Sequence, residues 1–192
     1  MSNTKKMLIE VARQLFAERG KKDVTMNDIA EASKKGRRTL YTYFNNKEEI
    51  YKAVIDKELD HILDSMKNVS SQKTEPDEKL RNHILAHLDA VRYAVNRNGS
   101  LRADFFRDIF EVDRKRRKID VQEIALIRQI VSEGIEKNIF KRMDVDLSAI
   151  IIFYAIKGLE VPYIRQNINS EFEKNKNSIV EFVFMGIKKK HS

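Results

Sequence analysis

The segment RRTLYTYF, residues 37–44, carries side chains that suit contact with the major groove of DNA. The forked end of an arginine can bond two acceptors on one guanine edge. At helical spacing, Leu40 and Phe44 share one side of the segment and leave polar residues exposed on the other. The predicted base-facing residues are Arg37, Arg38, Thr39 and Thr42.

Four residues of the same region are expected to contact phosphate. Thr25 and Lys47 stand at the expected N-termini of two neighbouring helices, where free backbone N–H groups and the helix dipole attract anions. Tyr41 and Tyr43 can reach phosphate oxygens with their hydroxyl groups. The alternative is that this basic, tyrosine-containing stretch is an ordinary solvated helix face.

The capping signals around the segment favour a helix-turn-helix over a solvated face. Thr25, followed three residues later by Asp28, forms a capping box that opens one helix. The run 33–36 ends that helix, and its last residue, a glycine, is an acceptable N-cap for the arginine-led helix. Asn46 and Glu49 repeat the capping arrangement and open a third helix. Because caps, turn and base-facing residues fall into one register, we predict a helix-turn-helix.

The first 55 or so residues resemble the DNA-binding end of the tetracycline-repressor (TetR-type) family. That family's motif runs roughly T-[VM]-x-x-I-A-x-x-A-G-V-S-x-G-T-L-Y-x-x-F-x-x-K. The matching residues are Thr25, Met26, Ile29, Ala30, Thr39, Leu40, Tyr41, Phe44 and Lys47. The resemblance implies a DNA-binding head, a C-terminal ligand-binding domain and a dimer formed by the last two long helices.

The turn departs from the family pattern. Ser33, Lys34, Lys35 and Gly36 stand where the family has alanine, glycine, valine and serine, and Arg38 replaces a small residue. The added positive charge is expected to strengthen contact with phosphates or bases.

The composition favours an all-α protein. Six Gly and two Pro in 192 residues leave few helix breakers, and the absence of cysteine excludes disulfides and thiolate chemistry. No apolar run approaches a membrane span, and the N-terminus lacks the apolar core of a signal peptide. We therefore expect a cytoplasmic protein without contact to a membrane.

The positive charge is concentrated at the N-terminus. Residues 1–52 carry 12 basic and 7 acidic side chains. Their net charge of +5 is more than half of the net charge of +8 of the whole chain. Such a distribution is typical of a nucleic-acid-binding head on a nearly neutral body. The expected architecture is a three-helix head at 1–47 and a helical regulatory and dimerisation domain at 48–192. A long helix over 46–68 connects the two.

Apolar residues at helical spacing predict further helices over 4–19, 76–96, 101–112, 119–137, 145–164 and 170–189. Residues 150–156 are apolar almost all the way round, and a helix of that kind needs partners on every side. We therefore predict a homodimer that pairs 150–159 and 179–187 with their copies. The alternative buries these helices within one subunit.

A ligand cavity is expected between helices of the C-terminal domain. Ligand sites in bundles are mostly apolar, with a few converging polar groups. The predicted lining residues are His87, Phe106, Arg128 and Tyr154, which would take a largely apolar small molecule with an anionic group for the arginine. The alternative is that the phenylalanines at 105, 106 and 110 are ordinary core.

Other patterns carry little chemistry. His83 and His87 have the i, i+4 spacing of metal ligands, but a third ligand is not evident. A polar pair at the edge of a ligand pocket, or plain structural histidines, is favoured. The run RKRRK at 114–118 has the composition of a nucleic-acid or lipid patch, although a solvated loop at a helix junction is favoured. We find no catalytic constellation and expect no cofactor.

The sequence thus predicts a transcriptional regulator, a repressor that binds a palindromic DNA operator as a dimer and is released by a small-molecule effector. One alternative is a ligand-independent architectural or host-factor protein that also binds DNA. A small helical enzyme is the other.

Overall fold

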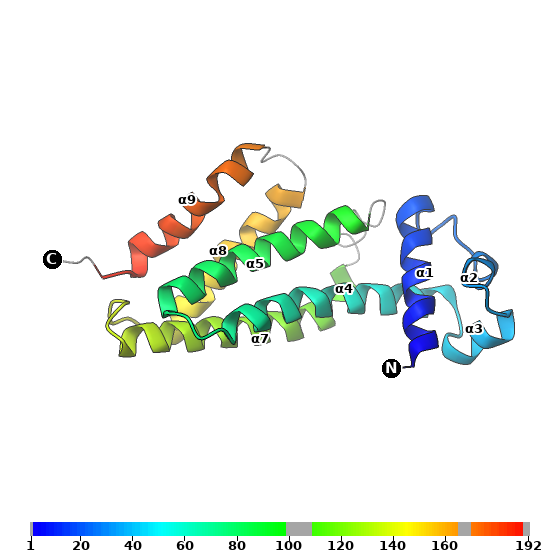
Figure 1. Ribbon diagram of the computed structural model, residues 1–192, viewed down its shortest axis with the longest axis horizontal. Coiled ribbons are helices and arrows are strands. Elements are labelled where there is room, and N and C mark those ends of the chain that lie inside the picture. Colours follow the sequence, from blue (N-terminus) through cyan, green and yellow to red (C-terminus); the bar gives the residue numbers. More distant parts are fainter. Residues whose placement is uncertain (1, 99–108, 165–169, 190–192) are drawn as a thin grey trace. The chain divides into compact units, whose positions relative to one another are not determined.

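The computed structural model describes residues 2–98, 109–164 and 170–189, and its regular elements are all helices (Figure 1). The helices are α1 (Asn3–Arg19), α2 (Met26–Ala32), α3 (Arg37–Tyr43), α4 (Lys47–Ser70), α5 (Pro76–Arg97), α7 (Ile109–Glu136), α8 (Val145–Ile164) and α9 (Ser170–Ile187). The predicted all-α class is confirmed. None of the described helices is long and apolar enough to cross a membrane.

The chain divides into two compact units. Unit 1 comprises Met1–Asp60 and Tyr93–Arg117, and unit 2 comprises His61–Arg92 and Lys118–Ser192. The division falls inside α4 rather than at its first residue, and the last turn of α5 belongs to unit 1. The predicted domain boundary after residue 47 stays a prediction.

Unit 1 is organised around an apolar core shared by its first four helices. The buried side chains are Leu8, Ile9, Ala12, Leu15, Phe16, Val24, Ile29, Ala30, Leu40, Phe44, Ile50, Tyr51, Val54 and Ile55. They recur at helical spacing, so each short helix buries one side in this core. Because isolated seven-residue helices are marginal in water, α2 and α3 depend on this packing.

The turn between α2 and α3 holds a strained residue. Lys34 has φ 53°, in the left-handed region that costs a non-glycine residue roughly 1–2 kcal/mol. The related family has glycine at this position. Gly36 is the N-cap of α3, as predicted, without a side-chain capping bond.

Lys34→Gly is expected to raise the free energy of unfolding by about 0.5–1 kcal/mol, because relief of the left-handed strain exceeds the entropic cost of glycine. Lys35→Gly is the matched control, since it removes the same charge at a position outside the left-handed region. That variant is expected to lose stability. Urea unfolding followed by circular dichroism measures both, and an equal change in the two variants would contradict the assignment of strain.

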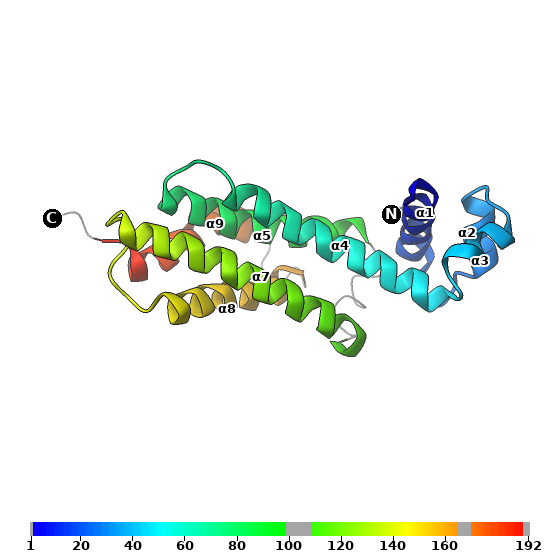
Figure 2. The same cartoon turned by 90° about the horizontal axis from the view of Figure 1, so that it is seen from below.

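Unit 2 has a larger core, to which α5, α7, α8 and α9 all contribute (Figure 2). The most deeply buried members are Leu80, Ile84, Leu88, Ile127, Ile130, Val131, Phe140, Ala149, Phe153, Ile156 and Val180. The helices expected over 76–96, 145–164 and 170–189 are therefore present with small shifts at their ends.

The prediction for 101–137 needs correction. Residues 99–108 lie outside the described part, and α7 runs without a break from Ile109 to Glu136. The basic run at 114–118 is therefore helical rather than a loop at a junction. Lysine and arginine are good helix formers, and neither glycine nor proline stands between 109 and 118, so charge alone does not end the helix.

Candidate DNA-binding and effector sites

The short helix α3 presents the predicted base-reading side chains to solvent. Leu40 is fully buried and anchors the helix, while Arg37 and Arg38 at its start are exposed. Thr42 is also exposed, but its hydroxyl donates to the carbonyl of Arg38 at 2.9 Å. Thr39 is half-buried. The two arginines are thus the longest base-facing groups of the helix.

Two tyrosines flank this surface. Tyr41 is 44% exposed and Tyr43 is half-buried. Both belong to α3, whose next residue, Phe44, is buried. Their predicted contact with phosphate stays a prediction.

Thr25 forms the predicted capping box. Its hydroxyl oxygen accepts from the backbone N–H of Asp28 at 3.2 Å, and its own N–H donates to the Asp28 carboxylate at 2.7 Å. The hydrogen bonds from Thr25 hold the pKa of Asp28 below its ordinary value. The backbone N–H and the hydroxyl of Thr25 are therefore both bonded to Asp28. A phosphate at this helix terminus would contact the backbone N–H groups that follow Thr25 rather than its hydroxyl.

Lys47 has a structural role that the sequence does not reveal. Its ammonium group donates to the carbonyls of Lys21 and Lys22 at 2.7 and 3.2 Å. Lys21 in turn pairs with Glu48 at 2.6 Å. The lysine at the start of α4 therefore holds the turn between α1 and α2, and its predicted contact with phosphate stays a prediction.

The three predicted cavity residues that the structure describes do not line a common site. Arg128 is exposed and forms an ion pair with Asp146, and Tyr154 is 62% exposed. Phe106 lies outside the described residues. Of the three described residues, His87 alone is buried, at 3% exposure. Arg128 directly follows the inward-facing Ile127, and a step of one residue turns the side chain off the buried face of a helix.

His87 lies between two buried carboxylates instead. Its Nδ1 is 2.7 Å from Oε1 of Glu123, and its Nε2 is 3.0 Å from Oε1 of Glu160. His83 is fully buried, with Nε2 3.3 Å from the same Glu123 oxygen and Nδ1 3.1 Å from the hydroxyl of Ser70. We call His83, His87, Glu123 and Glu160 the histidine–glutamate cluster.

Within this cluster, His87 and Glu123 stabilise each other's charged forms. Burial disfavours a charged imidazole, but the charge of Glu123 and the hydrogen bonds to both glutamates outweigh it and raise the pKa of His87 to about 9. Burial likewise opposes ionisation of Glu123, yet the two histidines lower its pKa to about 2. Among the described residues, no group of three or more His, Cys, Asp or Glu side chains is arranged to hold a metal ion.

The sequence held a signal for these glutamates. Glu123 falls in the register of the buried Ile119 and Ile127 on α7, and Glu160 in that of Phe153 and Ile156 on α8. An acidic residue on an apolar helix face needs a buried partner. The histidines of α5 supply it.

The outward side of α8 and α9 is apolar. Its exposed residues are Leu147 at 56%, Ile150 at 39%, Ile151 at 59%, Tyr154 at 62%, Phe182 at 78% and Met185 at 77%. A Cβ added at Gly158 or Gly186 would meet nothing within 4 Å, so this face is open. Phe184, by contrast, is 4% exposed and packs against Phe140. We call the exposed set the α8–α9 face.

Comparison with known proteins identifies the N-terminal part of the chain. Residues 8–54 match the model of the tetR family of bacterial regulatory proteins. The chain is 23% identical over 184 residues to the fatty acid metabolism regulator protein of Bacillus subtilis, and the alignment covers 95% of each chain.

Two solved structures share the fold over nearly their whole length. A transcriptional regulator from Cytophaga hutchinsonii has a TM-score of 0.76 at 24% identity, with 96% of this chain and 98% of that one covered. The regulator FadR of Bacillus subtilis in complex with stearoyl-CoA has a TM-score of 0.69 at 22% identity, with 93% and 96% covered. With the capped helix-turn-helix of α2 and α3, these findings identify residues 8–54 as a DNA-binding domain of the tetR family, in a chain that is similar to transcriptional regulators.

Proposed function

We propose that this protein is a repressor that binds a palindromic operator as a homodimer and releases it when an apolar small molecule binds unit 2. The observation that carries the proposal is α3, whose buried Leu40 fixes it while Arg37 and Arg38 face outward. Two such heads related by a twofold axis read two half-sites of a palindrome.

The α8–α9 face supports the dimer. It carries large exposed apolar side chains on two helices of unit 2, and monomeric proteins rarely expose large apolar patches. Pairing each face with its copy gives a four-helix contact of the isologous kind. Tyr154 belongs to this face, so we now assign it to dimer contact rather than to the ligand.

The histidine–glutamate cluster supports a ligand site within unit 2. Buried ionisable groups are costly unless they are paired, so a cluster of four in an apolar core suggests use in recognition. Nε2 of His83 lies 3.3 Å from Glu123 without a well-directed hydrogen bond, so a ligand carbonyl that displaced this contact would gain a donor. His83 and His87 replace Arg128 as the polar end of the proposed site.

The relatives suggest a class of effector. A relative from Bacillus subtilis is a fatty acid metabolism regulator, and the structure of the regulator FadR from the same organism contains stearoyl-CoA. A long acyl chain would suit an apolar site between helices, and its thioester or carboxyl carbonyl could accept a hydrogen bond from His83. We therefore propose an acyl thioester or fatty acid as the effector, acting by favouring a conformer whose heads no longer fit both half-sites.

The test has two steps. A palindrome selected by the protein from random duplexes is expected first, and an enzyme or an unspecific architectural protein would select none. Acyl-CoAs of graded chain length are then added to the complex, with free coenzyme A as the control. Release of the duplex by long chains supports the proposal, whereas binding that no acyl compound or free fatty acid alters would favour the ligand-independent alternative.

Arg37→Ala and Arg38→Ala are each expected to weaken binding to the selected palindrome, and at least one should relax base preference by about 1–3 kcal/mol.

Lys47→Ala should also weaken binding, because it frees the turn between α1 and α2. Since its ammonium is engaged within the protein, the salt dependence should stay near that of the parent. Fluorescence anisotropy over a range of salt concentrations measures all three. Unchanged specificity in both arginine variants would remove α3 from the role of recognition helix.

A further inference from the structure

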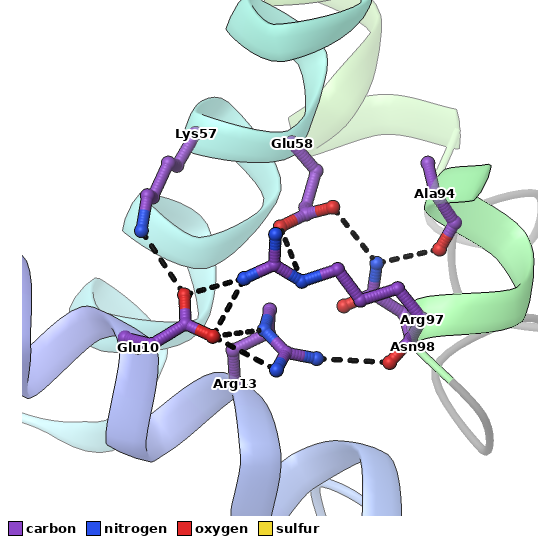
Figure 3. Close-up of polar contacts among 7 residues, drawn as sticks. All are labelled: Glu10, Arg13, Lys57, Glu58, Ala94, Arg97 and Asn98. Carbon is purple, nitrogen blue, oxygen red and sulfur yellow. Dashed lines mark hydrogen bonds and ion pairs between the residues drawn. The ribbon is translucent and has the colours of Figure 1, made fainter. Parts of the chain in front are cut away.

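Three helices of unit 1 meet at one carboxylate, far from the recognition helix in sequence (Figure 3). Nη2 of Arg97, in the last turn of α5, lies 2.6 Å from both oxygens of Glu10 on α1. Lys57 of α4 donates to the same carboxylate at 3.1 Å, and Arg13 of α1 donates to it at 2.9 Å. The predicted DNA contacts all fall between residues 25 and 47, so the involvement of α5 calls for an explanation.

The backbone at the C-terminus of α5 is also bonded to α1, as the side chain of Arg97 is. Nη1 of Arg13 donates to the carbonyl of Arg97 at 2.8 Å and so caps the C-terminus of α5 from α1. The side-chain amide of Asn98 donates to the carbonyl of Ala94 at 2.6 Å and to Glu58 of α4 at 3.1 Å. Figure 3 shows these residues converging from the three helices.

Several residues of this contact are buried, so its loss should cost more free energy than the loss of an ion pair on the surface. Glu58 and Asn98 are 2% and 0% exposed, and Arg13 is 7% exposed. Exposed ion pairs contribute little, whereas buried polar groups that lose their partner carry a large penalty. Burial would raise the pKa of Glu10, yet the hydrogen bonds from Arg13, Lys57 and Arg97 hold it at about 2.

We propose that Arg97, Glu10 and Arg13 are positioning residues that join the last turn of α5 to α1 within unit 1, so that α5 and the DNA-binding helices move together. The same continuous helix carries His83 and His87 of the proposed ligand site in its earlier turns. A displacement of α5 must therefore carry α1 along or break the contacts at Glu10. This consequence rests on the proposed function, whereas the joint itself does not.

The absence of cysteine in the natural chain allows a direct test. Gln14 on α1 and Asn96 on α5 are exposed, and both lie in unit 1. We would place spin labels on cysteines at these two positions of the full chain and measure their distance distribution by pulsed electron paramagnetic resonance. The parent is expected to give one narrow distribution.

Arg97→Gln and Glu10→Gln should each broaden the distribution, and the double variant should be no broader than the single ones because the two residues act together. Arg92→Gln is the matched control, since Arg92 lies on the same helix in an exposed pair with Asp89 at 3.9 Å. It should leave the distribution narrow. Arg97→Lys keeps the charge and should be intermediate. Circular dichroism checks that each variant folds.

The consequence for DNA binding is a change in tolerance of half-site spacing. Moving the half-sites apart by one base pair should lower the DNA affinity of the parent. This loss of affinity should be roughly tenfold smaller in Arg97→Gln, because that variant lacks the charged hydrogen bonds to Glu10. A broad distance distribution in the parent, or a broadening in Arg92→Gln equal to that in Arg97→Gln, would refute the proposed joint between α1 and α5. A narrow distribution with no selected palindrome would leave the joint intact and refute the proposed function.

Discussion

Ile151→Asp is expected to convert the protein from a dimer into folded monomers. Ile151 is 59% exposed on the α8–α9 face, so the substitution buries a charge only when two copies pair. An uncompensated buried charge costs about 3–5 kcal/mol, which raises the dimer dissociation constant by roughly a hundredfold or more. Sedimentation velocity at micromolar concentration measures this.

Phe184→Asp provides the contrast. Phe184 is 4% exposed and lies beside Phe140, so a charge there is buried within the subunit itself. Loss of helical circular dichroism is expected for this variant, and retention of it for Ile151→Asp. A parent protein that sediments as a monomer would contradict the dimer, as would an Ile151→Asp variant that remains dimeric.

Glu123→Gln is expected to lower the free energy of unfolding by about 3–5 kcal/mol, because it leaves the imidazolium of His87 without its closest carboxylate. The matched control is Glu133→Gln on the same helix, which breaks a less buried pair with Lys79 and should cost about 0–1 kcal/mol. Equal losses in the two variants would show that the cluster contributes no special stability.

The cluster also predicts how stability changes with pH. The pKa of His87 lies above its ordinary value of 6.5, so the stability that its charge provides is complete below 6.5. It is lost as the pH rises towards about 9. The facing groups are His83 of α5, Glu123 of α7 and Glu160 of α8. Urea unfolding from pH 6 to 9.5 should show this decline in the parent, and His87→Gln should flatten it.

The sequence was sufficient where a local pattern determines the structure. Thr25 and Asp28 form the predicted capping box because both partners lie within one helical turn. The helix starts at residues 26, 37 and 47 follow from such signals. The matching family motif placed α2 and α3 as well.

Prediction was weaker where the outcome depends on distant partners. Phe182 and Phe184 are alike in sequence, but only the second faces Phe140. The ammonium of Lys47 bonds carbonyls 25 and 26 residues away, a contact that no short pattern encodes. Tyr154 was expected inside a cavity because a hydroxyl among isoleucines suggested a ligand, and it lies on the exposed side of α8.

The most direct measurement is the number of chains bound to one labelled palindromic duplex, determined by sedimentation velocity with a random duplex and a single half-site as competitors. We predict two chains on the palindrome, much weaker binding to the half-site, and loss of the preference over random DNA in an Arg37→Ala, Arg38→Ala double variant. Equal affinity for palindromic and random duplexes, or one chain per palindrome, would contradict a dimeric repressor that reads DNA through α3.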